Sequence, residues 1–135
     1  MRISTKGRYA LRIMADLAMH NDGEYVRLKD ISERQAITLK YLEQIMPALT
    51  RAGLVKSLRG NHGGYMLAKK PEEYTAGEIL RVAEGSLSPL ACIEDTPNRC
   101  PRKDACVTLS FWEGMWELIN NYVDSVTLKD LISGK

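Results

Sequence analysis

The chain has few residues of the kinds that mark membrane or secreted proteins. No run of 18 or more apolar residues occurs among its 135 residues, so no segment reads as a transmembrane helix. The first residues, MRISTK, also lack the hydrophobic stretch of a secretory signal. We therefore expect a cytoplasmic protein with no membrane partner.

Residues typical of catalytic sites are also scarce. The chain has two histidines, His20 and His62, which are too far apart to complete an obvious zinc motif. No nucleophile with a nearby base, phosphate-binding loop or zinc-hydrolase motif is visible. We predict that the protein is not an enzyme and has no small-molecule substrate.

Charge is unevenly distributed along the chain, although the net charge is only +2. Residues 1–70 hold 13 of the 19 Lys and Arg but 6 of the 17 Asp and Glu, which gives this half a net charge of +7. Residues 71–135 have a net charge of −5. Such asymmetry favours a phosphate-binding module joined to a second module, although a solvated basic surface would explain charge alone equally well.

Hydrophobic spacing predicts three helices in the basic half. The first should run from about residue 4, capped by Ser4, to His20, and a short one should cover residues 28–35. Thr38 is a good N-cap for the third, with a bend expected at Pro47. Its inner face should consist of Leu39, Leu42, Ile45, Met46 and Leu49. A short helix, a tight turn and an amphipathic helix form a helix-turn-helix pattern.

Two short strands follow this pattern, at residues 54–59 and 65–68, with a glycine-rich tip between them. A hairpin placed directly after a helix-turn-helix is expected to be the wing of a winged helix. A plain surface hairpin would explain the glycines but not their position.

The acidic half is predicted to contain an irregular loop and a long helix. A capping box at residues 75–78 starts a helix that Gly85 ends. Residues 86–104 show no helical or strand period and contain Cys92 and Cys100, and Cys106 follows two residues later. A long helix should begin at Asp104 or Ala105, and Thr127 should cap a short final one. The predicted fold is mainly α with a small β-hairpin, divided into a winged helix-turn-helix domain (1–85), a cysteine loop (86–104) and a dimerisation helix with a short C-terminal helix (105–135).

Polar residues on the third helix and the hairpin tip are the candidate DNA contacts. A helix N-terminus fits the major groove, where Gln44 could bind adenine and Glu43 could accept a hydrogen bond from cytosine. Arg59 on a narrow hairpin suits the minor groove. Each residue alone could be a solvated surface group, but their order on consecutive elements favours double-stranded DNA as the partner. The full candidate set is Thr38, Lys40, Tyr41, Glu43, Gln44, Arg59, Asn61 and His62.

The long helix has a broad apolar stripe, which self-pairing would bury. It consists of Leu109, Trp112, Met115, Trp116, Ile119, Tyr122, Val123 and Val126. Such a stripe is more often core than ligand site, yet it is too broad for one small domain to cover. We expect a two-fold homodimer that presents two recognition helices to a palindromic operator.

Cys92, Cys100 and Cys106 lie within fifteen residues of a polar loop. In a cytoplasmic chain such a cluster is more often metal-binding or redox-active than structural. The spacing suits a loop around an iron–sulfur cluster, while zinc or three free thiols remain alternatives. The basic residues Arg99, Arg102 and Lys103 would favour the thiolate form.

Several of these motifs together resemble one family of regulators. They are residues 1–10 (MRISTKGRYA), 31–35 (ISERQ), 41–44 (YLEQ), 52–55 (AGLV), Arg59-Gly60 with 63–65 (GGY), and the three cysteines. The chain resembles, over nearly its whole length, the winged-helix family that includes the iron–sulfur cluster regulator IscR, the nitric-oxide-sensing repressor NsrR and the cysteine-metabolism repressor CymR. It looks most like the IscR branch.

The resemblance implies a homodimeric transcription regulator, expected to be a repressor, that uses Glu43, Gln44 and Arg59 to read DNA. It also implies a cluster, expected to be 2Fe-2S, on Cys92, Cys100 and Cys106, with control of cluster-assembly genes. Two departures leave the fourth ligand open, because Leu109 replaces the IscR-type histidine and Arg8 replaces the acidic ligand of some NsrR relatives. The candidates are Glu94, Asp95, Asp104, Thr108 or an exogenous group. The alternative function is a thiol, redox or nitric oxide sensor, or a cysteine-metabolism repressor without a cluster.

Overall fold

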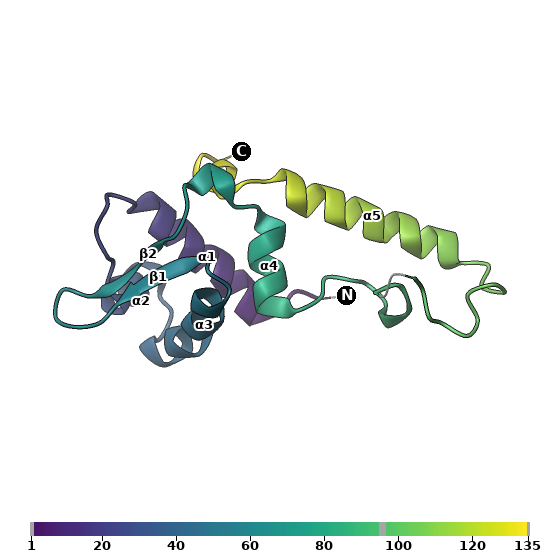
Figure 1. Cartoon of the computed structure of the whole chain (residues 1–135), viewed down its shortest axis with the longest axis horizontal. Coiled ribbons are helices and arrows are strands. Elements are labelled where there is room, and N and C mark those ends of the chain that lie inside the picture. The colour runs from purple at the N-terminus through teal and green to yellow at the C-terminus, as the bar shows by residue number, and fades with distance from the viewer. Residues whose placement is uncertain (1, 95–96, 135) are drawn as a thin grey trace.

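The architecture consists of a winged-helix body from which one long helix extends (Figure 1). The computed structural model describes residues 2–94 and 97–134. The α-helices are α1 (Thr5–Met19), α2 (Leu28–Gln35), α3 (Leu39–Arg51), α4 (Ala76–Glu84), α5 (Leu109–Ser125) and α6 (Leu128–Ile132). Strands β1 (Val55–Leu58) and β2 (Gly64–Leu67) form the hairpin, and short 3-10 helices lie at η1 (Pro71–Glu73) and η2 (Ala91–Ile93). The predicted fold class, mainly helical with one hairpin, is confirmed.

Helix α1 is the central element of the core. Ser4 caps it by accepting a hydrogen bond from the backbone N–H of Gly7. One face of α1 buries apolar side chains spaced three and four residues apart, and these meet the inner faces of α2, α3 and α4. The completely buried members include Ala10, Ile13, Met14, Ile31, Leu42, Met46, Leu49 and Ile79.

The turn between α2 and α3 sets the helix-turn-helix geometry. Ala36 takes the left-handed conformation with φ of 54°, which is uncommon for a residue with a side chain. Thr38 then caps α3, as predicted, and α3 continues through Pro47 to Arg51. The expectation that Leu39 belongs to the inner face is wrong, because this residue begins the helix at the surface and its side chain is 45% exposed.

The two strands of the hairpin pair with each other, and the segment before α2 pairs with β2. The strands are antiparallel, with Val55 opposite Leu67 and Leu58 opposite Gly64. Val26 adds a bridge to Tyr65, with backbone N–O distances of 2.7 and 2.8 Å. Gly64 has φ of +152°, and a Cβ there would collide with the carbonyl of Val26. The segment before α2 therefore pairs with the wing at Val26.

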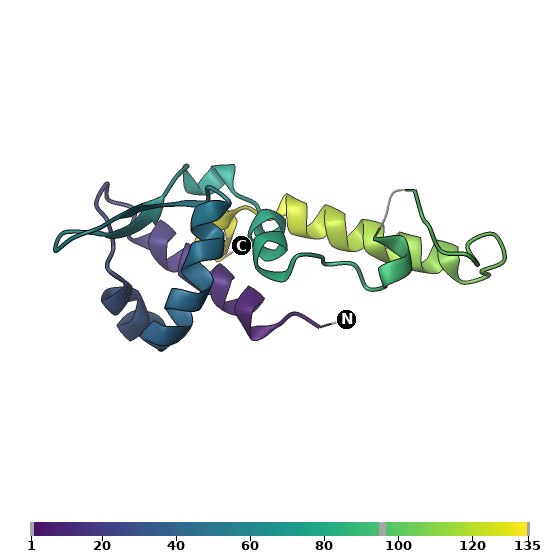
Figure 2. The same cartoon turned by 60° about the horizontal axis from the view of Figure 1, so that its bottom comes forward.

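Buried Tyr74 closes the base of the hairpin. Its hydroxyl donates to the carbonyl of Leu54 (2.6 Å) and accepts from the backbone N–H groups of Ala68 (2.9 Å) and Lys69 (3.0 Å). Leu128 of α6 is also completely buried in this core. The short C-terminal helix therefore packs on α1 of the body, although it follows α5 in the chain (Figure 2).

Two expectations about helix starts require correction. Thr75 caps α4 through the N–H of Glu78, but no returning bond completes the predicted capping box, because the Glu78 carboxylate lies 3.5 Å from Lys69 Nζ instead. Helix α5 begins at Leu109 rather than at Asp104 or Ala105. Turns, with bonds such as Lys103 N–H to the Cys100 carbonyl, occupy the preceding residues and prevent the helical ladder from starting earlier.

Candidate nucleic-acid interface and cysteine loop

The N-terminal turns of α3 present most of the predicted base-reading side chains to solvent. Lys40, Glu43 and Gln44 are exposed, whereas Leu42, Ile45 and Met46 are buried on the opposite face. Thr38 is exposed too, and its hydroxyl accepts a hydrogen bond from the Tyr41 N–H (3.2 Å). Burial of one face therefore fixes the direction in which the other face points.

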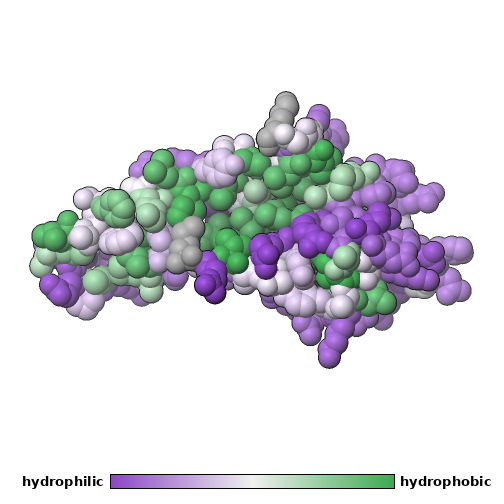
Figure 3. Space-filling view, turned by 180° about the vertical axis from the view of Figure 1, so that it is seen from behind, coloured by the Kyte–Doolittle hydropathy of each residue, from purple (hydrophilic) through white to green (hydrophobic). Residues whose placement is uncertain are grey.

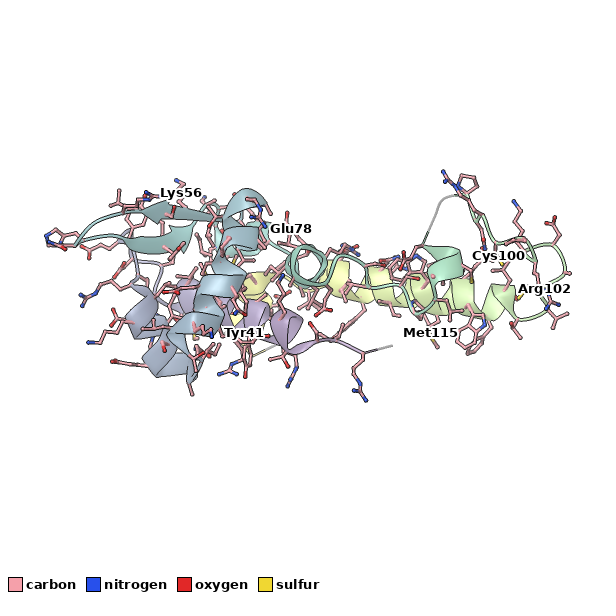
Figure 4. All side chains as sticks on the ribbon, turned by 90° about the horizontal axis from the view of Figure 1, so that it is seen from below. Tyr41, Lys56, Glu78, Cys100, Arg102 and Met115 are labelled. Atoms are coloured by element: carbon pink, nitrogen blue, oxygen red, sulfur yellow. The ribbon has the colours of Figure 1, made fainter. Side chains whose placement is uncertain are left out.

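Tyr41 is only partly exposed because α1 supports it. Its ring meets the edge of the Tyr9 ring at a centroid distance of 5.1 Å, and Arg12 lies over the Tyr9 ring at 5.1 Å. Arg12 also donates to the side chain and the backbone carbonyl of Gln35, at the end of α2. These contacts hold Tyr41 against α1 near the start of α3, where Figure 4 labels it.

The wing divides its predicted contact residues between two hollows. Arg59 lines a groove of about 360 Å³ between the hairpin and the C-terminal end of α3, together with Thr50, Arg51 and Tyr65. Asn61 and His62 at the tip line a separate hollow of about 600 Å³ with Glu24 and Arg27. The structure thus brings Arg59 toward α3 but places Asn61 and His62 against the loop before α2.

Two basic residues were missed as candidates. Arg51 lines the groove with Arg59, and exposed Arg12 lies beside the Tyr9–Tyr41 pair. Arg51 lies seven residues, or two helical turns, after Gln44, so the sequence spacing alone places both on the same face of α3. Nothing in the local sequence signals the position of Arg12, because its neighbourhood with Tyr41 and Gln35 arises from the packing of α1.

A buried carboxylate connects α1 to α2. Asp16 is completely buried and accepts hydrogen bonds from Arg34 Nη2 (2.7 Å), Arg34 Nε (3.0 Å) and Gln35 Nε2 (3.0 Å). Burial alone would raise the pKa of Asp16, but hydrogen bonds from Arg34 and Gln35 bring this pKa below its ordinary value. The interaction fixes the first helix of the helix-turn-helix on the core.

Cys100 lies at the far end of the molecule from Tyr41 (Figure 4). Cys92 and Cys100 are partly exposed and Cys106 is exposed. Within residues 2–94 and 97–134, no three Cys, His, Asp or Glu side chains are gathered closely enough to hold a metal ion. The donor set itself, three thiols, fits a thiophilic metal or cluster, and binding one would require the thiols to come together.

Polar side chains lie close to two of these cysteines. Thr108 Oγ1 lies 3.5 Å from Cys106 Sγ, and this contact lowers the pKa of the Cys106 thiol. Asn98 accepts a bond from the Cys100 N–H (2.8 Å), while its buried Nδ2 donates to no partner in the described structure. Among the candidate fourth ligands, Glu94 and Asp104 are exposed, Thr108 is already beside a thiol, and Asp95 lies outside the described residues.

Helix α5 has two apolar faces rather than the single stripe expected. Ile119 and Val123 face α4 and line a small apolar cavity with Leu80 and Leu87. On the other side Phe111 and Leu118 are 61% and 72% exposed, and they line a groove of about 630 Å³. Both were omitted from the predicted stripe, although they are seven residues apart. Figure 3 shows hydrophobic residues gathered over the part that contains α5, whereas hydrophilic ones cover much of the winged-helix body.

In the described residues, no helix combines the length and apolar character needed to span a bilayer.

Comparison with known proteins gives consistent matches over the whole chain. Residues 3–134 match the family described as Rrf2, iron-dependent transcriptional regulator. A helix-turn-helix-type transcriptional regulator of Neisseria meningitidis is 44% identical over 135 residues, which is all of this chain and 90% of that protein. The regulator CymR of Bacillus subtilis is 42% identical, over 98% of this chain and 91% of its own.

A solved structure of IscR from T. potens agrees with the fold. It is 41% identical, covers 99% of this chain and 88% of that one, and has a TM-score of 0.78. This match and the CymR match confirm two of the three predicted relatives, IscR and CymR, which are transcription regulators and not enzymes. The chain therefore belongs to the Rrf2 family of DNA-binding transcription regulators.

Proposed function

We propose that this protein is a homodimeric, sequence-specific regulator whose DNA binding depends on an iron–sulfur cluster held by Cys92, Cys100 and Cys106. The observation that supports it is the separation of two exposed sites on one chain. The recognition helix and wing form one, the cysteine loop forms the other, and α5 connects them. A regulator of this kind would act in the cytoplasm, where the chromosomal DNA lies.

DNA binding would place the N-terminal turns of α3 in the major groove. Glu43 and Gln44 are exposed there and would contact base edges, with Lys40 and Thr38 at phosphates. Arg59 would enter the adjacent minor groove, and Asn61 and His62 at the tip would contact the backbone. Tyr41, held by Tyr9, would pack against the DNA backbone beside the helix start.

Selection from a random duplex library tests this assignment. The wild-type protein should enrich a two-fold symmetric site, and its affinity should fall steeply with added salt as phosphate contacts are lost. Glu43→Ala should relax the base preference at one position of each half-site by about 1–3 kcal/mol while salt dependence persists. Glu33→Ala, at an exposed position on α2, is the matched control. An unchanged preference in Glu43→Ala removes this residue from the reading set.

The second copy would pair through the exposed face of α5. Phe111, Leu118 and the 70% exposed Tyr122 would be covered by the same face of the partner. Analytical ultracentrifugation should give a dimer for the wild type and for the control Glu113→Ala, which lies on α5 outside the groove. Leu118→Asp should shift it to monomer. A monomeric wild type at micromolar concentration contradicts the dimer.

The cysteine loop would supply three thiolate ligands, and a bound cluster would respond to iron, oxygen or nitric oxide by being gained, lost or modified. Within the chain, Thr108 would remain beside Cys106, and Asn98 Nδ2 would be available to donate to a nearby sulfur. Repression of cluster-assembly genes is the expected output, by resemblance to the IscR branch.

Anaerobic purification tests the cofactor directly. We expect a coloured protein with visible absorbance and bound iron and sulfide, and loss of these in Cys92→Ala and Cys106→Ala. A colourless, iron-free wild type from cluster-replete cells contradicts the cluster. The exposed Cys106 and the CymR likeness favour a metal-free thiol switch as the second candidate, which thiol titration and metal analysis would then identify.

A further inference from the structure

We propose that Arg81 is a positioning residue that fixes the angle between α5 and the winged-helix body through Asp124. In the dimer this angle determines which separation of the two DNA half-sites the protein accepts. The inference rests on the proposed function, since it concerns how two copies share one operator.

Arg81 on α4 donates three hydrogen bonds to side chains of α5. Its Nη1 donates to Asp124 Oδ1 (2.7 Å), and its Nη2 donates to Asp124 Oδ2 (3.1 Å) and to Asn120 Oδ1 (2.9 Å). Asn120 and Asp124 are one helical turn apart on α5, so the planar guanidinium spans both. A two-pronged contact of this kind fixes direction as well as distance.

The surrounding contacts bring α5 close to α4 at this same end. A Cβ on Gly77 would collide with the Asp124 carboxylate and meet Val123 Cγ2 at 2.9 Å. Just beyond α5, the N–H of Ala76 donates to the Val126 carbonyl (2.8 Å) and the N–H of Leu128 donates to the Tyr74 carbonyl (3.0 Å). The C-terminal end of α5 is therefore fastened to the body, while its N-terminal half extends away beside the cysteine loop (Figure 1).

The exposure of the pair argues for a role in orientation rather than in stability. The side chains of Arg81 and Asp124 are 36% and 47% exposed. Ion pairs this accessible contribute little to the free energy of unfolding. The core of the body does not depend on them, so their removal should leave each protomer folded while allowing α5 to tilt.

A small tilt is enough to matter for DNA. Helix α5 has 17 residues, so at 1.5 Å per residue it is about 25 Å long. A tilt of about 8° at the fastened end displaces the N-terminal end of α5, and with it a partner paired there, by roughly 3.5 Å relative to the body, which is about the rise of one base pair. One added base pair also rotates the second half-site by about 35°. A fixed clamp thus makes the dimer selective for spacing.

The experiment uses the full-length protein and the site selected by the wild type, rebuilt with its centre shortened or lengthened by one to three base pairs. Affinities for this series are measured for the wild type, Arg81→Ala and the nearly isosteric Asp124→Asn. Glu78→Gln is the matched control, because Glu78 lies on the same helix in a similarly exposed ion pair. Its partner is Lys69, which is not part of α5.

We expect the wild type and Glu78→Gln to bind one spacing best. In Arg81→Ala and Asp124→Asn the penalty for a one-base-pair change should fall by about fivefold, in the range seen for residues that couple two sites. An unchanged spacing profile in either variant, or an equal loss in Glu78→Gln, overturns the positioning role alone. A wild type that binds no two-half-site duplex overturns the proposed function and this role with it.

Discussion

Replacement of Asp16 by Asn tests whether one buried carboxylate holds the helix-turn-helix on the core. The substitution keeps the volume but removes the charge and places an N–H₂ group where an acceptor stood. Asn keeps a single acceptor oxygen for the three donors, two from Arg34 and one from Gln35. Because the amide nitrogen faces further donors, at least one of the three present bonds becomes a donor–donor contact.

The size of the effect follows from the burial of this pair. Breaking a fully buried ion pair costs about 3–5 kcal/mol because a charge is left without its partner. Asp16 is completely buried, but the side chain of Arg34 is 35% exposed and can recover some hydration. We therefore expect Asp16→Asn to lower the free energy of unfolding by about 2–3 kcal/mol at pH 7.

Urea unfolding followed by far-UV circular dichroism, at one fixed protein concentration, measures this difference. The matched control is Asp30→Asn on α2, whose carboxylate lies 3.9 Å from Arg27 in an accessible pair. This control should change stability by less than about 0.5 kcal/mol. The buried pair does not anchor α2 if the free energy of unfolding of Asp16→Asn lies within about 1 kcal/mol of the wild-type value. The same conclusion follows if Asp16→Asn is no less stable than Asp30→Asn.

Three further predictions concern pH, the hairpin base and the wing. The pKa of Asp16 is lowered on folding, so its contribution to the free energy of unfolding is complete above its ordinary pKa of about 3.9 and is lost as the pH falls through its folded pKa. Measurements of stability against pH in the acid range should show this loss in the wild type and not in Asp16→Asn. Tyr74→Phe leaves a buried carbonyl and two N–H groups without their partner and should cost about 2 kcal/mol in urea unfolding, against less than about 0.5 for Tyr25→Phe. Gly64→Ala should cost more than about 1 kcal/mol and speed amide exchange at Val26, because the new Cβ meets this residue's carbonyl; unchanged exchange would contradict that packing.

Local pattern was sufficient for the elements of the body. Spacing of apolar residues and the caps Ser4, Thr38 and Thr127 predicted the helices, because one face of each must be buried and each N-terminus needs an acceptor. The exposed positions of Glu43 and Gln44 follow from the same spacing. Leu39 was misplaced, since a first-turn residue can satisfy the period and still lie beyond the edge of the core.

The three-dimensional arrangement decided which distant groups meet. The motifs shared with the family, the order of the elements and the close spacing of the three thiols could all be predicted from the chain, because they depend on residues that are near neighbours in it. Packing alone placed Asp16 against Arg34, Arg12 against Gln35, and Arg81 across from Asp124, since each pair joins two different helices. It also gave α5 a second, outward apolar face, because only the position of the body determines which side of that helix is already covered.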